Sequence, residues 1–250
     1  YEAGFIGAGS MGGALAQAAV KTAGGGRVAV ACSTPEHSEK AAARLGCAAE
    51  TAETILWESR FVFLGVKPQM IAGVVKKLAG DIAGSDAIFV SMLAGTSLER
   101  LAELLGADKK IIRIMPNTPV AVGEGMTQYC CNAQVSRQTV QEFLQDMRYS
   151  GHLDELEERL IDAASALSGC GPAYMYLFIE ALADGAVACG IPRGKAMEYA
   201  AATMAGAAQM VLTTGLHPGA LKDAVCSPGG STIAGVRVLE QHGFRGAAMD

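Results

Sequence analysis

The sequence predicts an α/β fold, with a doubly wound, mostly parallel sheet in residues 1–150 and an all-α region in residues 151–250. In the first part, short runs of β-branched and other apolar residues alternate with segments of helical periodicity, the pattern of βαβ units. From about Leu153 the strand signal ends, and helical segments follow one another with Gly and Pro between them. Half of the 250 residues are hydrophobic and only 18% are charged, which excludes a disordered chain.

The individual elements follow from these patterns. The expected strands are Ala3–Ile6, Arg27–Ala31, Phe61–Val66, Ala87–Met92, Lys110–Met115 and Gly125–Cys130. The helices expected between them are Gly12–Ala23, Pro35–Leu45, Gln69–Ala79, Ser97–Leu105 and Ser136–Arg148. The second half is predicted to consist of the helices Glu155–Leu167, Pro172–Cys189, Arg193–Thr213, Pro218–Val225 and Ser231–Gln241. Prolines stand at the starts of two of these helices and glycines just beyond three ends, as helix boundaries favour.

Charge and cysteine usage argue against several kinds of partner and site. A net charge of −5 makes nucleic acid or an anionic membrane an unexpected partner. The seven cysteines are odd in number and form no C-x-x-C pair, and the four histidines are scattered, so neither a disulfide framework nor a metal site is expected. Charged residues interrupt the most apolar stretches, so no membrane span is expected. Reduced thiols and the lack of a signal-peptide pattern predict a cytoplasmic protein.

Residues Gly7 to Gly12 form a G-x-G-x-x-G motif that follows the first expected strand and opens the first helix. Glycines at this spacing allow a tight turn, the close approach of a pyrophosphate and close packing of helix on strand. The helix N-terminus adds free N–H groups and a partial positive charge. A plain Gly-rich turn is the alternative. Because strand, glycines, helix and second strand occur in the required order, we predict a Rossmann-type dinucleotide-binding domain.

The end of the second strand indicates which dinucleotide binds. NAD sites usually place Asp or Glu about 20 residues beyond the glycine motif, where it holds the ribose 2′-OH. Here Ser33 and Thr34 stand at that point, and their hydroxyls can donate hydrogen bonds to a 2′-phosphate without repelling it. NADPH is therefore the expected cofactor. NADH stays open, because no arginine stands at this point.

Three further strand ends carry residues that are candidates for the same crevice, since ligands of open α/β sheets bind outside the carboxyl ends of the strands. Val66, Lys67 and Pro68 follow one strand, and Met92, Leu93 and Ala94 follow the next. In isolation Lys67 would be interpreted as a solvated surface lysine, and its position between a strand end and a proline makes a functional role an equally good interpretation. Asn117 stands between two prolines and could bond a carboxamide, or could form an Asx turn with its own backbone.

A second glycine-rich helix start lies near the C-terminal end, in the segment from Cys226 to Thr232. The N–H groups of Gly230, Ser231 and Thr232 would be free there, which makes a second anion cradle suited to a substrate carboxylate. An ordinary capped helix, with Ser231 or Thr232 as the cap, explains the same residues. These residues alone leave both interpretations open, the anion cradle and the capped helix.

Five motifs occur together and in order: Gly4 to Gly9, Val66 to Gln69, Met115 to Pro119, Ser168 to Tyr174 and Leu221 to Thr232. With them the whole chain closely resembles the pyrroline-5-carboxylate reductase family, which catalyses the last step of proline biosynthesis. The last motif is the most specific, and the first is shared with many dehydrogenases. The main departures are Cys170, where a serine is commoner, and Ser231, where Ala or Thr is usual.

The resemblance implies roles for residues of this chain. It implies that the loop from Ile6 to Met11 (Ile6, Gly7, Ala8, Gly9, Ser10, Met11) holds the pyrophosphate of NAD(P)H. It places Ser33 and Thr34 beside the adenosine ribose, and Val66, Lys67, Pro68, Met92, Leu93 and Ala94 along the cofactor. Val225, Ser227, Gly230, Ser231 and Thr232 match the pocket for the cyclic imino acid, in which the Thr232 hydroxyl could bond the ring nitrogen as the residue nearest the chemistry.

The family's helical domain is exchanged between two subunits, so the resemblance implies a domain-swapped homodimer, and such dimers often assemble into decamers. The composition agrees, because Arg193–Thr213 is rich in Ala and Met on nearly every face, and such a helix must be buried. The helical half alone offers little cover, so a second subunit is expected.

Two other functions are compatible with the opening motif. A β-hydroxyacid dehydrogenase needs a general base, and members of that group resemble one another in a lysine soon after a helical glycine motif. Here Gly169-Cys170-Gly171 is followed by Pro172 to Tyr176 without a lysine, which argues against it. A non-catalytic NADP-binding sensor would keep both glycine loops without turnover.

Overall fold

The computed structural model describes all residues, Tyr1–Asp250, and the chain divides into two compact units, Tyr1–Tyr174 and Met175–Asp250. The compact units therefore divide later in the chain than the expected boundary at residue 150. Residues 151–155 form a strand of the sheet, and the helix that follows them also belongs to the first unit. The sequence hides this strand because Gly151-His152-Leu153-Asp154-Glu155 is largely polar, as a strand with one covered side can be.

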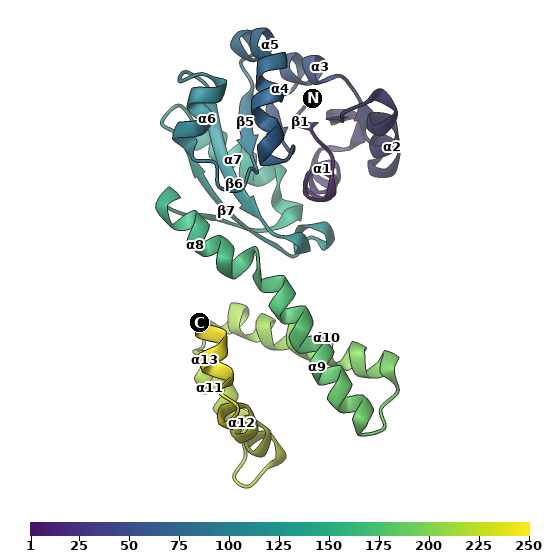
Figure 1. The fold of residues 1–250 in the computed structure, drawn as a ribbon, viewed down its shortest axis with the longest axis vertical. Helices are drawn as coiled ribbons and strands as arrows, with labels where there is room; N and C mark the ends of the chain where they lie inside the picture. Colours follow the sequence, from purple (N-terminus) through teal and green to yellow (C-terminus); the bar gives the residue numbers. More distant parts are fainter. The chain divides into compact units, whose positions relative to one another are not determined.

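The first unit is built on one eight-stranded sheet with the order β3-β2-β1-β4-β5-β6-β7-β8. Figure 1 shows this sheet, with β1, β5, β6 and β7 labelled. The strands are β1 (Ala3–Ile6), β2 (Val28–Ala31), β3 (Ala48–Ala49), β4 (Phe61–Leu64), β5 (Ile88–Ser91), β6 (Lys110–Pro116), β7 (Gly125–Cys131) and β8 (Gly151–Glu155). Every neighbouring pair is parallel except β6 and β7. The predicted doubly wound, mostly parallel sheet is thus confirmed, with β3 and β8 added at its two edges.

The helices of the first unit are α1 (Ser10–Ala23), α2 (Pro35–Leu45), α3 (Ala52–Glu58), α4 (Ile71–Lys77), α5 (Ala79–Gly84), α6 (Leu98–Leu105), α7 (Arg137–Asp146) and α8 (Glu158–Ser168). Short 3₁₀ helices cover Gly25–Arg27, Pro68–Met70, Thr118–Val122 and Arg148–Ser150. Sequence reasoning missed α3 and α5. The signal for α3 is Thr51, whose hydroxyl accepts from the Thr54 amide as an N-cap.

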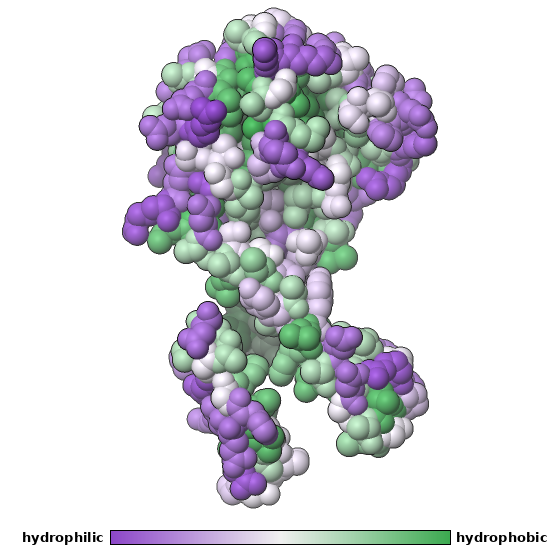
Figure 2. Space-filling model, viewed as in Figure 1, coloured by the Kyte–Doolittle hydropathy of each residue, from purple (hydrophilic) through white to green (hydrophobic).

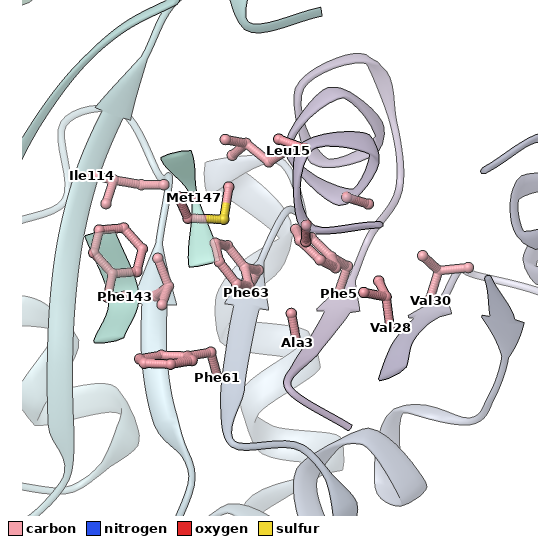
Figure 3. Packing of buried hydrophobic residues seen from close by; sticks show 14 of the residues in the cluster. Ala3, Phe5, Leu15, Val28, Val30, Phe61, Phe63, Ile114, Phe143 and Met147 are labelled. Atoms are coloured by element: carbon pink, nitrogen blue, oxygen red, sulfur yellow. The ribbon is translucent and has the colours of Figure 1, made fainter. Parts of the chain in front are cut away.

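The core lies on both faces of the sheet because alternate residues of each strand point to opposite sides. On one face Phe5, Phe61 and Phe63 pack with α1, α2 and α7 (Figure 3). On the other, Val62 and Leu64 pack with α3, α4, α5 and α6. The Phe5 and Phe63 rings stack with centroids 4.3 Å apart. These aromatic contacts fix β1 and β4, from whose ends the two glycine-bearing loops emerge.

The second unit contains helices only, which confirms the all-α C-terminal region. They are α9 (Gly171–Ala188, crossing the division between the units), α10 (Arg193–Thr214), α11 (Pro218–Ala224), α12 (Ser231–Gln241) and α13 (Phe244–Met249). Its buried apolar cluster is small, with Ala183, Ala196 and Ala200 at the centre. Large apolar side chains remain exposed on these helices, where hydrophobic residues are visible at the surface (Figure 2). None of the chain's helices combines the length and apolar character that crossing a membrane requires.

Candidate functional site

Gly7 after β1, Gly65 after β4 and Gly12 in the first turn of α1 contact one another so closely that none has room for a side chain. A Cβ on Gly7 would stand 2.6 Å from the Gly65 carbonyl oxygen. A Cβ on Gly12 or on Gly65 would come closer than 3.0 Å to the Gly7 carbonyl oxygen. Gly7 also has a φ of +99°, which favours glycine. The loop after β1 is therefore held tightly against α1 and the loop after β4.

Gly9 differs from these three glycines. No atom of the chain lies within 4 Å of the position that its Cβ would take. Gly9 is the N-cap of α1 and has no side chain to cap the helix, so the amides of Ser10 and Met11 keep no partner within the chain. The first turn of α1 thus presents open backbone donors, as the sequence predicts. A pyrophosphate fits this cradle, because it accepts such donors and needs the space that Gly9 leaves.

A cleft of about 550 Å³ opens at this loop. Its lining includes Gly7, Ala8 and Gly9 from the glycine loop, Cys32 and Ser33 from the end of β2, and Gly65, Val66 and Lys67 from the end of β4. The structure therefore brings together three of the predicted strand ends. Ile6 is buried beneath the loop, and its carbonyl accepts from the Gly65 amide. Pro68 directly follows the cleft residue Lys67 and begins a 3₁₀ helix.

Basic side chains are concentrated in this cleft. His37, Lys40 and Arg44 of α2 line it together with Lys67, and no acidic side chain does. In a chain with a net charge of −5, such a lining is suited to phosphate groups. Sequence reasoning singled out only Lys67. The signal for the others was the spacing of 37, 40 and 44, which lies on one face of a helix.

The loop after β2 is fixed to α2. Thr34 is the N-cap of α2 and its hydroxyl accepts from the His37 amide, 3.3 Å away. Buried Ser38 accepts from the Cys32 amide at 2.8 Å and donates to the Thr34 carbonyl at 3.2 Å. Ser33 is exposed in the cleft, with its Oγ 3.4 Å from His37 Nδ1. Of the two predicted hydroxyls, Ser33 is thus free to face a ligand, while Thr34 already serves as a helix cap.

The loop after β5 carries three predicted cofactor residues that lie outside the lining of the cleft. Met92, Leu93 and Ala94 follow β5, which lies beside β4 in the sheet, but none of them lines the cleft. The Leu93 side chain is fully buried, so only its backbone is available to a ligand. Ala94 is exposed.

Asn117 corrects a sequence expectation. Its side chain is buried and occupied at both ends: Nδ2 donates to the Ser168 carbonyl at 2.9 Å, and Oδ1 accepts from the Met126 amide at 2.8 Å. Neither the carboxamide contact nor the local Asx turn was the right interpretation. Asn117 instead ties the loop after β6 to β7 and to the end of α8.

Helix α8 is fixed to the sheet at both ends, by residues that the sequence did not reveal. At its start, buried Arg113 of β6 donates to Glu158 at 3.0 Å and to Asp162 at 2.8 Å. Glu158 also accepts from the Leu98 amide at the start of α6. At its end, the Ser168 hydroxyl donates to Gln128 Oε1 at 3.0 Å. These contacts join residues that are 40 to 60 positions apart in the sequence, so no local sequence pattern predicts them.

The second cradle lies in the helical unit, between α11 and α12. The Gly230 amide is not free, contrary to expectation, because it donates to the Ser227 carbonyl at 3.0 Å across a turn in which Gly229 has a φ of +70°. The amides of Ser231 and Thr232, in the first turn of α12, have no partner within the chain, and no side chain caps the helix. Val225, Ser227, Ser231 and Thr232 are all exposed.

The cysteines and acids form no competing centre. All seven cysteines are free thiols, and no group of three or more His, Cys, Asp or Glu side chains is arranged to hold a metal ion. Burial raises the pKa of Cys130 to about 12 and that of Cys131 to about 11. These two thiols are therefore held in their protonated, unreactive form at neutral pH.

Comparison with known proteins gives consistent matches over the whole chain. Residues 158–250 match the family model described as "Pyrroline-5-carboxylate reductase dimerisation", and residues 2–95 match "NADP oxidoreductase coenzyme F420-dependent". The chain is 41% identical to pyrroline-5-carboxylate reductase of Escherichia coli, covering 99% of this chain and 93% of that protein. It is 42% identical to that of Glycine max, covering 100% and 92%.

Solved structures agree. The NADP-bound pyrroline carboxylate reductase of Plasmodium falciparum matches with a TM-score of 0.86 at 29% identity, covering 99% of this chain and 92% of that one. The enzyme of Streptococcus pyogenes also matches at 0.86, with 34% identity and coverage of 98% and 92%. A 3-hydroxyisobutyrate dehydrogenase of Mycobacterium tuberculosis, 15% identical with a TM-score of 0.53, shares the fold alone. The fold, the glycine-loop cleft and these similarities agree that the chain belongs to the pyrroline-5-carboxylate reductase family.

Proposed function

We propose that this protein reduces 1-pyrroline-5-carboxylate to L-proline, with NAD(P)H as the hydride donor. The observation that carries the proposal is a pair of uncapped helix starts in a chain of this family. One, at Ser10 and Met11, opens on a basic cleft, and the other, at Ser231 and Thr232, lies in the exposed segment that matches the substrate pocket. Each can bind one anion: the cofactor's pyrophosphate and the substrate's carboxylate.

The protein's contribution to the reaction is to orient the substrate for hydride transfer. A protonated cyclic imine is already electrophilic, so the reaction needs neither a metal nor a strong catalytic acid. A nicotinamide cofactor supplies the hydride when it is bound. The amides of Ser231 and Thr232 hold the carboxylate and so fix the ring, and the Thr232 hydroxyl accepts a hydrogen bond from the iminium N–H. Such positioning lowers the entropic part of the barrier.

NADPH is the proposed cofactor, and NADH an alternative donor. The residues that would hold it are Gly7, Ala8, Gly9, Ser10 and Met11 at the pyrophosphate and Ser33 beside the adenosine ribose, with Val66, Lys67, Pro68, Met92, Leu93 and Ala94 along its length. The support is that no acidic side chain lines the cleft, so nothing there repels a 2′-phosphate. Asn117 is not among them, because its amide is already bonded within the protein.

The protein is proposed to act as a homodimer with exchanged helical domains, with further assembly into a decamer, in the cytoplasm. The support for self-association is the helical unit itself. It leaves Tyr176 and Leu177 of α9, Met210 and Leu212 of α10, and Val238 of α12 exposed around a core of a few alanines. Exposed apolar area of this kind marks an interaction surface. The seven free thiols suit a reducing compartment.

An assay of NADPH consumption by the full-length protein tests the function. We expect NADPH oxidation with 1-pyrroline-5-carboxylate and the formation of one proline for each NADPH consumed. Oxidation of a 3-hydroxy acid with NADP⁺, without imine reduction, would instead assign a β-hydroxyacid dehydrogenase. Tight NADPH binding without turnover of either substrate would assign a non-catalytic sensor.

A further inference from the structure

Two basic side chains of the cleft, Lys67 and Arg44, have no hydrogen-bond or ion-pair partner within the protein, and Arg44 is the one to which no role has been given. Arg44 stands near the end of α2 and forms no ion pair or hydrogen bond with any other residue. Its neighbour on the same face, Lys40, is bound to Glu36 at 2.6 Å, one turn earlier. An arginine that lines a cleft without a carboxylate partner is available to an external anion.

The guanidinium of Arg44 reaches from α2 to α1. Its Nη2 lies 3.1 Å from the point that a Cβ on Gly13 would occupy. Gly13 is in the first turn of α1, and a Cβ there would also lie 3.4 Å from the carbonyl oxygen of Ala8. The bare backbone of Gly13 therefore leaves the space in which Arg44 rests beside the glycine loop.

Arg44 is one of three basic residues along this side of the cleft. His37, Lys40 and Arg44 are spaced by three and four positions, so they share the face of α2 that lines the cleft. The row starts at His37, whose ring lies 3.4 Å from the Ser33 hydroxyl at the end of β2. It ends at Arg44, beside α1. The acidic residues of the same helix, Glu36 and Glu39, do not line the cleft.

We propose that Arg44 determines the specificity for NADPH over NADH by binding the 2′-phosphate of the adenosine ribose, with His37 and Lys40 on the same helix face. The proposal rests on the NAD(P)H-dependent function given above and assigns a residue that it leaves open. The planar guanidinium suits a phosphate dianion, which it can hold through two parallel N–H···O bonds.

The 2′-phosphate is favoured over the pyrophosphate for two reasons. The uncapped start of α1, at Ser10 and Met11, already offers backbone donors to the pyrophosphate. The basic row instead lies on α2, the helix that follows β2, and β2 is the strand whose end recognises the ribose in dinucleotide-binding folds. The donor needed for the extra phosphate is thus supplied from the helix instead of the strand end.

Binding of nucleotide fragments tests the proposal without any turnover. The affinities of 2′,5′-ADP and 5′-ADP are measured by calorimetry on the full-length protein, for wild type and Arg44→Met. We expect Arg44→Met to weaken 2′,5′-ADP by about 10-fold or more, since hydrogen bonds to charged groups are worth about 1.5–3 kcal/mol. The affinity for 5′-ADP should change by less than about 2-fold. Arg44→Lys should fall between, because it keeps the charge and loses the planar fork.

The matched control is Arg137→Met, which removes an equal charge from α7. The Arg137 side chain is 88% exposed and does not line the cleft, so salt should screen its effect. Equal weakening of both fragments by Arg44→Met would move the contact to the phosphates shared by NADPH and NADH, and unchanged affinities would remove Arg44 from the site. Either result overturns the proposal. Because the readout is binding, a protein that fails to reduce 1-pyrroline-5-carboxylate can still confirm or refute it.

Discussion

Replacing Gly9 and Gly12 by alanine, one at a time, separates two tasks of the glycine loop. The two residues belong to one motif, yet their surroundings differ. Around Gly9 the position of a Cβ is empty to 4 Å, and its φ of −67° and ψ of −160° suit any residue. At Gly12 a Cβ would come closer than 3.0 Å to the Gly7 carbonyl oxygen, nearer than real Cβ atoms are found.

The expected effects on stability follow from this difference. Gly9→Ala should change the free energy of unfolding by no more than about 0.5 kcal/mol, or raise it slightly by restricting the unfolded chain. Gly12→Ala must push the Gly7 backbone away from Gly65, and forcing atoms into such a site costs about 1–3 kcal/mol or more. Denaturant unfolding of the two variants measures both values.

The expected effects on binding are different. Gly9→Ala places a methyl group where the pyrophosphate must approach the amides of Ser10 and Met11. Loss of one such hydrogen bond to a charged group costs about 1.5–3 kcal/mol, or roughly 10- to 150-fold in the Kd for NADPH. A folded Gly9→Ala protein that binds NADPH as tightly as wild type would refute the placement of the pyrophosphate. A Gly12→Ala protein of unchanged stability would refute the packing argument.

Four further predictions concern single residues. Ser33→Asp should weaken NADPH but not NADH, since a carboxylate would repel the 2′-phosphate; an unchanged ratio of the two Kd values would contradict this. Thr232→Ala should lower kcat/KM for 1-pyrroline-5-carboxylate by roughly 10- to 100-fold while Thr232→Ser keeps most activity; near-normal kinetics in both would leave orientation to the backbone amides. Arg113→Met should lower the free energy of unfolding by about 2 kcal/mol, as measured by urea unfolding, because two charge-assisted hydrogen bonds are lost. The loss is not larger because the side chains of Glu158 and Asp162 are 33% and 69% exposed and can be rehydrated. Burial, aided by Glu2, raises the pKa of Asp146 above its ordinary 3.8, so its ionisation destabilises the fold as pH rises through the native pKa; Asp146→Asn should raise Tm at neutral pH and leave it unchanged below pH 3.8.

The parts of the fold that the sequence predicts are those with strong local periodicity. Apart from the short β3, the strands from Ala3 to Cys131 carry continuous apolar patterns, as the long helices do, and their alternation predicts a parallel sheet. The misses have physical reasons. The strand Ala48–Ala49 is too short to show a pattern, and Gly151–Glu155 is too polar to be told from a loop. Because the strand Gly151–Glu155 belongs to the first unit, the boundary between the units also lies later than the sequence predicts.

For the site, the sequence predicts the backbone turns at the glycines, but it does not predict which side chains bond to one another. The anion cradle of the glycine loop is predictable, because the spacing of the glycines and the order of strand, loop and helix determine the turn. The turn at Ser227-Pro228-Gly229-Gly230 could also have been foreseen, since Pro followed by Gly at its centre favours a turn that consumes the fourth amide. The partners of Asn117 could not, because Ser168 lies 51 positions away.

The route of the transferred hydride tests the central claim most directly. NADPH carrying deuterium at the transferable position of nicotinamide C4 is supplied with 1-pyrroline-5-carboxylate, and the product is analysed by mass spectrometry and NMR. We expect proline with one deuterium on the former imine carbon, the ring carbon bonded to nitrogen that does not carry the carboxylate. Proline without deuterium, or consumption of NADPH without proline, would contradict direct hydride transfer to a bound cyclic imine.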